Sequence, residues 1–69
     1  METTVSALLE RNRFSRKDIY RIYDPLLGWL NYEYTGRGKY GVQIKRPGSK
    51  DILLLDLFAP SSRVKVIKL

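Results

Sequence analysis

The feature that most constrains this chain is a change of apolar periodicity at Trp29. Beyond this residue, apolar and tyrosine side chains recur at every second position on both sides of a glycine-rich stretch: Leu30, Tyr32, Tyr34, Tyr40, Val42 and Ile44. A period of two places such side chains on one face of a strand. Residues 31–46 are therefore predicted to form a β-hairpin whose tip, residues 35–39, carries Arg37 and Lys39.

The length of 69 residues allows one domain, residues 1–69, with one modest core. The chain contains no cysteine and no histidine, so disulfides, thiolate sites and histidine-based zinc sites are excluded. We expect stability to come from packing, with self-association as a possible aid.

A first helix is predicted over residues 4–12. Thr3 or Thr4 can cap it, and Val5, Leu8 and Leu9 follow at helical spacing.

A second helix is predicted to start at Ser15, because Ser15 to Asp18 has the spacing of a capping box. Apolar residues continue at helical spacing through Ile19, Ile22, Tyr23, Leu26, Leu27 and Leu30. Pro25 should break or kink this helix, with Asp24 capping the turn that follows and Gly28 ending it.

Two more strands are predicted after the hairpin. Residues 51–58 are apolar on both faces, which indicates a central strand, and residues 63–69 carry lysines typical of an edge strand. The predicted fold is α+β, with two short N-terminal helices followed by a four-stranded antiparallel β-meander. Its predicted core is Val5, Leu8, Leu9, Ile19, Ile22, Tyr23, Leu26, Leu30, Val42, Ile44, Leu53, Leu55, Leu57 and Val64.

The net charge of +6 is clustered. Residues 11–21 hold five basic side chains against one acid, Asp18, and residues 37–50 hold five with no acid. Such clusters suit nucleic acid, an acidic protein surface or anionic lipid, whereas a solvated surface that only aids solubility gives the same composition.

Catalysis is disfavoured by the residue types present. Without histidine or cysteine, the remaining acid–base groups are carboxylates, lysine and tyrosine. Asp51 and Asp56 lie five apart in a predicted strand and so point to opposite faces, and Asp24 is better explained as a cap. The Gly36-Arg37-Gly38 stretch lacks the phosphate-loop consensus and is explained by hairpin geometry. We expect no enzyme activity, no cofactor and no metal.

The tyrosines allow two interpretations. Tyr32, Tyr34 and Tyr40 share the phase of apolar neighbours, which favours core packing over a platform for unpaired bases. Tyr20 is out of phase with Ile19 and Ile22 in a helix, so we expect it to be exposed.

A capped basic helix followed by a hairpin with a basic tip resembles the recognition helix and wing of a winged helix-turn-helix domain, over about residues 4–46. That family has three helices before its wing, whereas two are readable here. The resemblance implies DNA binding through helix and wing. The predicted nucleic-acid-binding residues are Arg13, Arg16, Lys17, Tyr20, Arg21, Arg37, Lys39, Lys45 and Arg46. We expect the cations of the predicted second helix and of the hairpin tip to converge on one exterior surface.

The alternative is a small protein-binding regulator or inhibitor that self-associates, as a homodimer, and docks on an acidic protein surface. Its second apolar face would include Leu54, Phe58 and Trp29. No apolar run approaches the roughly 20 residues needed to cross a bilayer, and residues 1–9 lack the features of a signal peptide. We expect no membrane partner and an intracellular location, cytoplasmic or in the nucleoid or nucleus.

Overall fold

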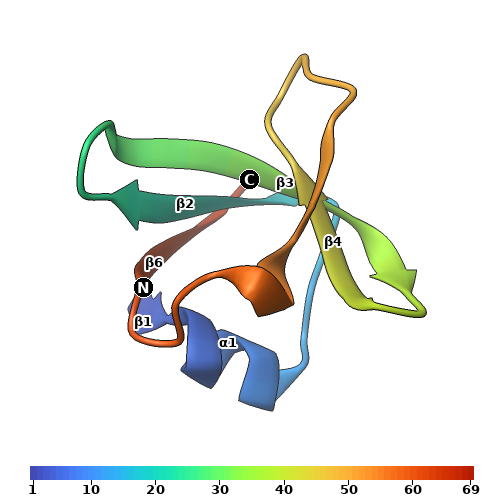
Figure 1. Ribbon diagram of the computed structural model, residues 1–69, viewed down its shortest axis with the longest axis horizontal. Coiled ribbons are helices and arrows are strands. Elements are labelled where there is room, and N and C mark those ends of the chain that lie inside the picture. The colour runs from blue at the N-terminus through green and yellow to red at the C-terminus, as the bar shows by residue number, and fades with distance from the viewer.

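The computed structural model describes residues 1–69 and is organised around one six-stranded antiparallel sheet (Figure 1). Its strands are β1 (Glu2–Thr4), β2 (Asp18–Asp24), β3 (Gly28–Gly38), β4 (Gly41–Lys45), β5 (Ile52–Leu54) and β6 (Arg63–Lys68). The helical elements are α1 (Val5–Arg11) and the 3₁₀ turn η1 (Leu55–Leu57). Strands account for 51% of the chain and helical elements for 14%. The predicted fold of two helices and a four-stranded meander is therefore wrong.

The strand order is β1-β6-β2-β3-β4-β5. Strand β6 lies between β1 and β2, so the prediction that residues 63–69 form an edge strand is wrong. Strand β5 pairs only with β4 and occupies an edge, although a central strand was predicted there. It ends after three residues because the chain turns into η1, where Phe58 N–H donates to the Leu55 carbonyl at 3.1 Å.

Helix α1 lies close to the predicted bounds. Thr4 caps it by accepting a hydrogen bond from the Ala7 N–H at 3.2 Å, and Asn12 ends it in the left-handed conformation at φ 54°. Val5 and Leu8 point into the core. The helix has only seven residues and lacks the length and apolar composition needed to span a bilayer.

The second predicted helix is absent, and residues 18–24 form strand β2. Burial alternates along this segment: Asp18, Tyr20 and Ile22 are buried, and the residues between them are more exposed. Its isoleucines and tyrosines favour extended backbone, and β3 and β6 pair with it on both sides. Without this helix, the resemblance to a winged helix-turn-helix domain is wrong as well.

Two hairpins follow β2. In the first, Asp24 pairs with Gly28, and the Asp24 carboxylate accepts the N–H groups of Leu26 and Leu27 at 2.7 and 3.0 Å. Asp24 is thus a cap, as predicted, but of a hairpin turn. The second is the predicted hairpin, in which β3 and β4 pair with a bulge between Tyr34 and Gly36. Its tip is shorter than the predicted residues 35–39, because β3 continues to Gly38 and the turn is only residues 39–40.

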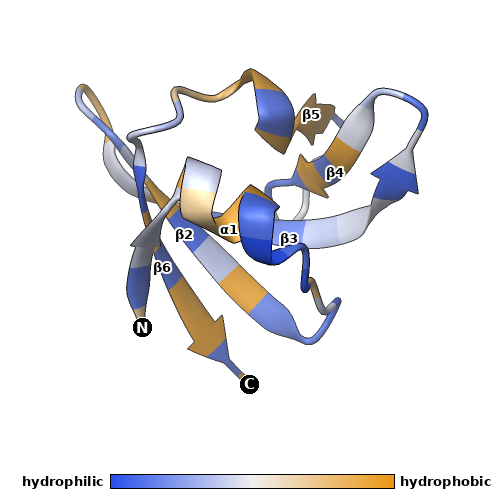
Figure 2. Ribbon diagram, turned by 90° about the horizontal axis from the view of Figure 1, so that it is seen from below, coloured by the Kyte–Doolittle hydropathy of each residue, from blue (hydrophilic) through white to orange (hydrophobic).

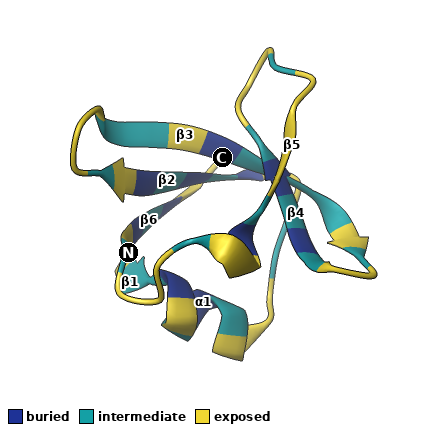
Figure 3. Cartoon of the chain, in the orientation of Figure 1, coloured by how far each residue is buried: buried dark blue, intermediate teal, exposed yellow.

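The core is one cluster of ten buried residues between the sheet and the two helical elements: Val5, Leu8, Tyr20, Ile22, Tyr32, Val42, Ile44, Leu55, Val64 and Val66. Figure 2, seen from below, shows α1 in front of β2 and β3. Figure 3 shows buried segments along the strands and the facing side of α1, with exposed residues in the turns.

Several predicted core residues are exposed. Leu26 is 93% exposed in the first hairpin turn, and Leu57 is 80% exposed on η1. Tyr23 and Leu53 are also exposed, and Ile19 is half-buried. In a helix, Ile19, Tyr23 and Leu26 would share one face, which is why all three were predicted to lie in the core. In strand β2, Ile19 and Tyr23 instead lie on the face opposite the buried Tyr20 and Ile22.

Candidate nucleic-acid interface

The outward face of strands β6, β2 and β3 carries two adjacent rows of aromatic and basic side chains. In one row, Arg21 is in register with Lys65 of β6 and with Asn31 of β3. In the next, Tyr23 is in register with Trp29, and Arg63 follows on β6. Residues in register share a face of the sheet, so both rows lie on the side opposite Tyr20 and the core.

Trp29 is at the centre of the second row. The Tyr23 ring meets it edge-on, with 5.3 Å between centroids. The Lys65 Nζ lies 4.3 Å from the indole centroid, and the Arg63 guanidinium carbon lies 5.3 Å from it. Cation–π contacts of this kind hold the positive charges beside the aromatic rings.

The outward-facing carboxylates of β3 and of the neighbouring strand β1 are neutralised. Glu2 forms an ion pair with Arg63 at 2.5 Å, and Glu33 forms one with Lys45 at 3.4 Å. Arg21 and Lys65 take part in none of the three ion pairs of the molecule. The face therefore has a net positive potential from cations that no neighbouring acid satisfies.

A shallow hollow adjoins these rows. It is lined by Arg21, Trp29, Leu30, Asn31, Arg46 and Pro47. The Nε–H of Arg21 is buried and has no hydrogen-bond acceptor, and the protein offers no partner to the rest of its guanidinium group. We define the outer aromatic–basic face by its residues, which are Arg21, Tyr23, Trp29, Arg46, Arg63 and Lys65.

Two of the predicted cations, Arg16 and Arg37, lie elsewhere. Arg16 donates to the Thr35 carbonyl at 2.8 Å and lies over the Tyr34 ring, 5.6 Å from its centroid. Arg37 donates to the Asn12 side chain. Tyr34 and Arg37 are in register with the buried Ile44 and Val42, so this cluster lies on the core side of the sheet. Both arginines fasten the segment after α1 to the bulge of β3.

The predicted convergence of cations is thus only partial. Arg16 and Arg37 each form a hydrogen bond near the β3 bulge, whereas Arg21 and Arg46 both line the hollow of the outer face. Lys45 forms an ion pair with Glu33. Among the remaining predicted site residues, Lys39 lies at the hairpin tip beside Tyr40, which is 73% exposed. Arg13, just after α1, and Lys17, just before β2, are also exposed.

Tyr20 cannot be the exposed aromatic residue predicted for the site. Its side chain is 2% exposed, and its hydroxyl accepts the Ser15 N–H at 3.0 Å. Burial raises the pKa of Tyr20 and also that of Tyr32, since the low-dielectric surroundings disfavour the phenolate. The favoured core interpretation holds for Tyr32, which belongs to the core, and for Tyr34, which packs against it, but it is wrong for Tyr40, which is exposed at the hairpin tip.

The sequence pattern did not predict that Tyr23 and Trp29 belong to the binding surface. Tyr23 had been assigned to the core, and Trp29 to a second apolar surface. Had residues 18–24 been read as a strand, period-two alternation would have separated Arg21 and Tyr23 from Tyr20 and Ile22. The position of β6 next to β2, which supplies Arg63 and Lys65, has no comparable local signal.

Comparison of the chain with protein-family models, with curated proteins and with solved structures finds no significant match. No group of three or more carboxylates is placed to hold a metal ion. The class of molecule defined by fold and surface is a small antiparallel β domain with a basic, aromatic outer sheet face.

Proposed function

We propose that this protein is a binding module for single-stranded nucleic acid and that the strand lies across the outer aromatic–basic face. The observation that carries the proposal is the position of Trp29, flanked by Tyr23 and within 5.3 Å of two cations on a face whose carboxylates are all ion-paired. Bases stack on aromatic rings regardless of sequence, and neighbouring cations neutralise phosphates.

A single strand suits this surface better than a duplex. The α-helix of the molecule has seven residues, and its apolar side is committed to the core, so no helix is available to enter a major groove. A sheet face with an aromatic residue between cations suits unpaired bases, whose planes are accessible. Lys65 must leave the indole face for a base to stack there, and its ammonium then reaches a phosphate.

The test uses the only tryptophan of the chain, Trp29, as a reporter. Titration with oligothymidine should quench its fluorescence, and anisotropy of a labelled oligonucleotide should give the affinity at several salt concentrations. If Arg21, Arg46 and Lys65 each neutralise one phosphate, the slope of log K against log salt is about −2. Duplex of the same length should bind more weakly.

Two matched variants locate the site. Arg21→Gln/Lys65→Gln removes two positive charges from the outer face and should weaken binding and flatten the salt slope. Arg16→Gln/Arg37→Gln removes two charges from the β3 bulge and should leave the slope nearly unchanged. The absence of both fluorescence quenching and binding at low salt would reject the proposal. Weaker binding in Arg16→Gln/Arg37→Gln alone would show that the nucleic acid binds at the β3 bulge and not on the outer aromatic–basic face.

Self-association is the second candidate function, favoured by the apolar edge at β5. Leu53, Leu54, Leu57 and Phe58 line a wholly apolar hollow there, and the outer edge of β5 is unpaired. Antiparallel pairing with β5 of a second copy would place Leu53 opposite its equivalent and cover exposed leucines. Sedimentation of wild type and Leu57→Asp tests this: a dimer dispersed by the substitution supports it, and a wild-type monomer at millimolar concentration rejects it.

A further inference from the structure

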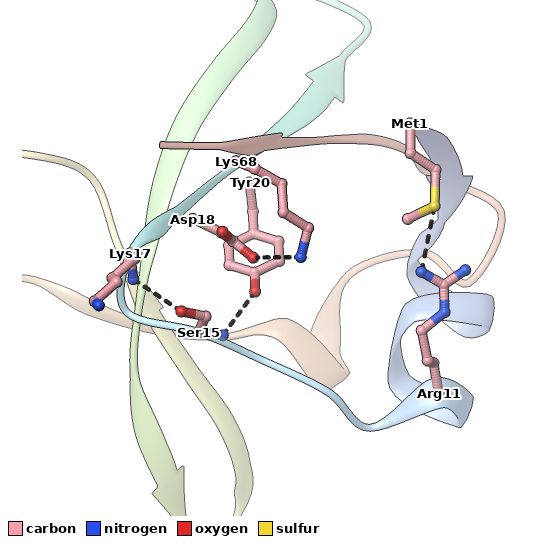
Figure 4. A network of polar contacts seen from close by, with 7 residues as sticks. All are labelled: Met1, Arg11, Ser15, Lys17, Asp18, Tyr20 and Lys68. Carbon is pink, nitrogen blue, oxygen red and sulfur yellow. Dashed lines mark hydrogen bonds and ion pairs between the residues drawn. The ribbon is translucent and has the colours of Figure 1, made fainter.

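A cavity with a mixed lining lies between the end of α1 and strands β2 and β6. Met1, Leu8 and Val66 form its apolar part, and Asp18 and Tyr20 its polar wall. Arg11, Arg13 and Lys68 surround them. Figure 4 shows Asp18, Tyr20 and Lys68 side by side, with Arg11 on the facing helix. A second hollow adjoins the cavity and shares Arg13, Asp18 and Lys68 with it.

The charges of this cavity favour an anion. The Lys68 Nζ lies 3.3 Å from the Asp18 carboxylate and compensates its charge. Arg11 has one polar contact, from its guanidinium to the Met1 sulfur at 3.4 Å, and a thioether is a weak acceptor. Arg13 forms no ion pair. Three cations and one carboxylate leave two positive charges without a counter-charge.

Tyr20 gives an independent indication of a ligand. Tyr20 is only 2% exposed, yet it is one of the residues that line the cavity. The hydroxyl oxygen accepts the Ser15 N–H, but no protein group accepts the hydroxyl proton. A buried donor without an acceptor is costly, and an oxygen of a ligand in the cavity would satisfy it.

We propose that this cavity binds a small organic anion, a carboxylate or phosphate group attached to an apolar body. The anionic oxygens accept hydrogen bonds from Tyr20 and from the guanidinium groups of Arg11 and Arg13, while the apolar body packs on Leu8 and Val66. The site is separate from the outer aromatic–basic face, because Tyr20 and Arg21 point to opposite sides of β2. Anion binding at this cavity can therefore be tested separately from nucleic-acid binding.

The test is an amide NMR titration of the whole chain with four probes. Phenyl phosphate and phenylacetate each combine an anion with an apolar body, inorganic phosphate has only the anion, and benzyl alcohol has the apolar body without charge. Both organic anions should shift amides of residues 8–20 and 66–68 saturably, and more tightly than the other two probes. The tighter of the two identifies the preferred anionic group.

Variants assign the effect to the cavity. Arg11→Gln/Arg13→Gln should weaken binding at least ten-fold, and Lys39→Gln/Lys50→Gln, which removes two charges elsewhere, should not. Tyr20→Phe, checked for an intact amide spectrum, should weaken binding about ten-fold through loss of a hydrogen bond to a charged group. The proposal is overturned by no saturable shift at millimolar anion, by benzyl alcohol binding equally well, or by equal losses in the two charge variants.

Discussion

Replacement of Gly41 by alanine should remove much of the stability of the fold. Gly41 begins β4 with φ of +121°, and a Cβ built on it would overlap the Asp56 carboxylate, with Cγ only 2.6 Å away. That carboxylate accepts the Val42 N–H at 2.7 Å and so joins η1 to β4. Alanine at this position must both strain the backbone and displace Asp56.

The magnitude follows from these two effects. A side chain at such a φ costs about 1–3 kcal/mol, and loss of a hydrogen bond to a charged acceptor costs about 1.5–3 kcal/mol. Gly41→Ala should therefore lower the free energy of unfolding by about 4 kcal/mol. Domains of this size have a total of only about 3–10 kcal/mol.

Urea unfolding followed by Trp29 fluorescence measures the change. Gly48→Ala is the matched control: its φ is +81° and no atom lies within 4 Å of the added Cβ, so only strain of about 1–2 kcal/mol is expected. In an Asp56→Ala background, Gly41→Ala should lower the free energy of unfolding only by the cost of backbone strain, because the hydrogen bond from the Val42 N–H is already lost. Strict additivity of the two substitutions, or equal costs at Gly41 and Gly48, would show that the contact with Asp56 is not the cause.

Three further predictions concern local features. Because burial raises the pKa of Tyr20 and Tyr32 in the folded state, their protonated forms stabilise the fold fully below about pH 10, and this stabilisation is lost above pH 10 at a rate of at most about 1.4 kcal/mol per pH unit for each tyrosine. In urea unfolding between pH 9 and 11.5, the free energy of unfolding of Tyr20→Phe should fall with pH about half as steeply as that of the wild type, since only Tyr32 then contributes. A slope equal to that of the wild type would contradict the raised pKa of Tyr20. Asp24→Ala should cost about 1–2 kcal/mol and speed amide exchange at Leu26 and Leu27, whereas Asp24→Asn should not; equal exchange in both variants would refute the capping role. Thr4→Ala should lower stability by about 1 kcal/mol in thermal unfolding, with Thr4→Ser near wild type, and equal losses would show that the hydroxyl is not the cap.

Part of the candidate site could be predicted from the sequence. The cations Arg21 and Arg46 were named as nucleic-acid ligands, and the structure places both beside the hollow of the outer face. Tyr23 and Trp29 were not, since their orientation depends on whether residues 18–24 form a helix or a strand. Seven residues with isoleucine and tyrosine at several spacings fit either period, and pairing partners elsewhere in the chain decide between them.

What the sequence determined by itself is local: helix α1 with its Thr4 cap, the β3–β4 hairpin, and the turn-capping role of Asp24. These features depend on residues within a few positions of one another, so their energetics can be read along the chain. The tertiary structure decided which strands are neighbours. Pairing of β6 with both β1 and β2 joins the two ends of the chain, buries Tyr20, and brings Lys65 to Trp29. Such contacts gain their energy from surfaces distant in sequence, and no local pattern encodes them.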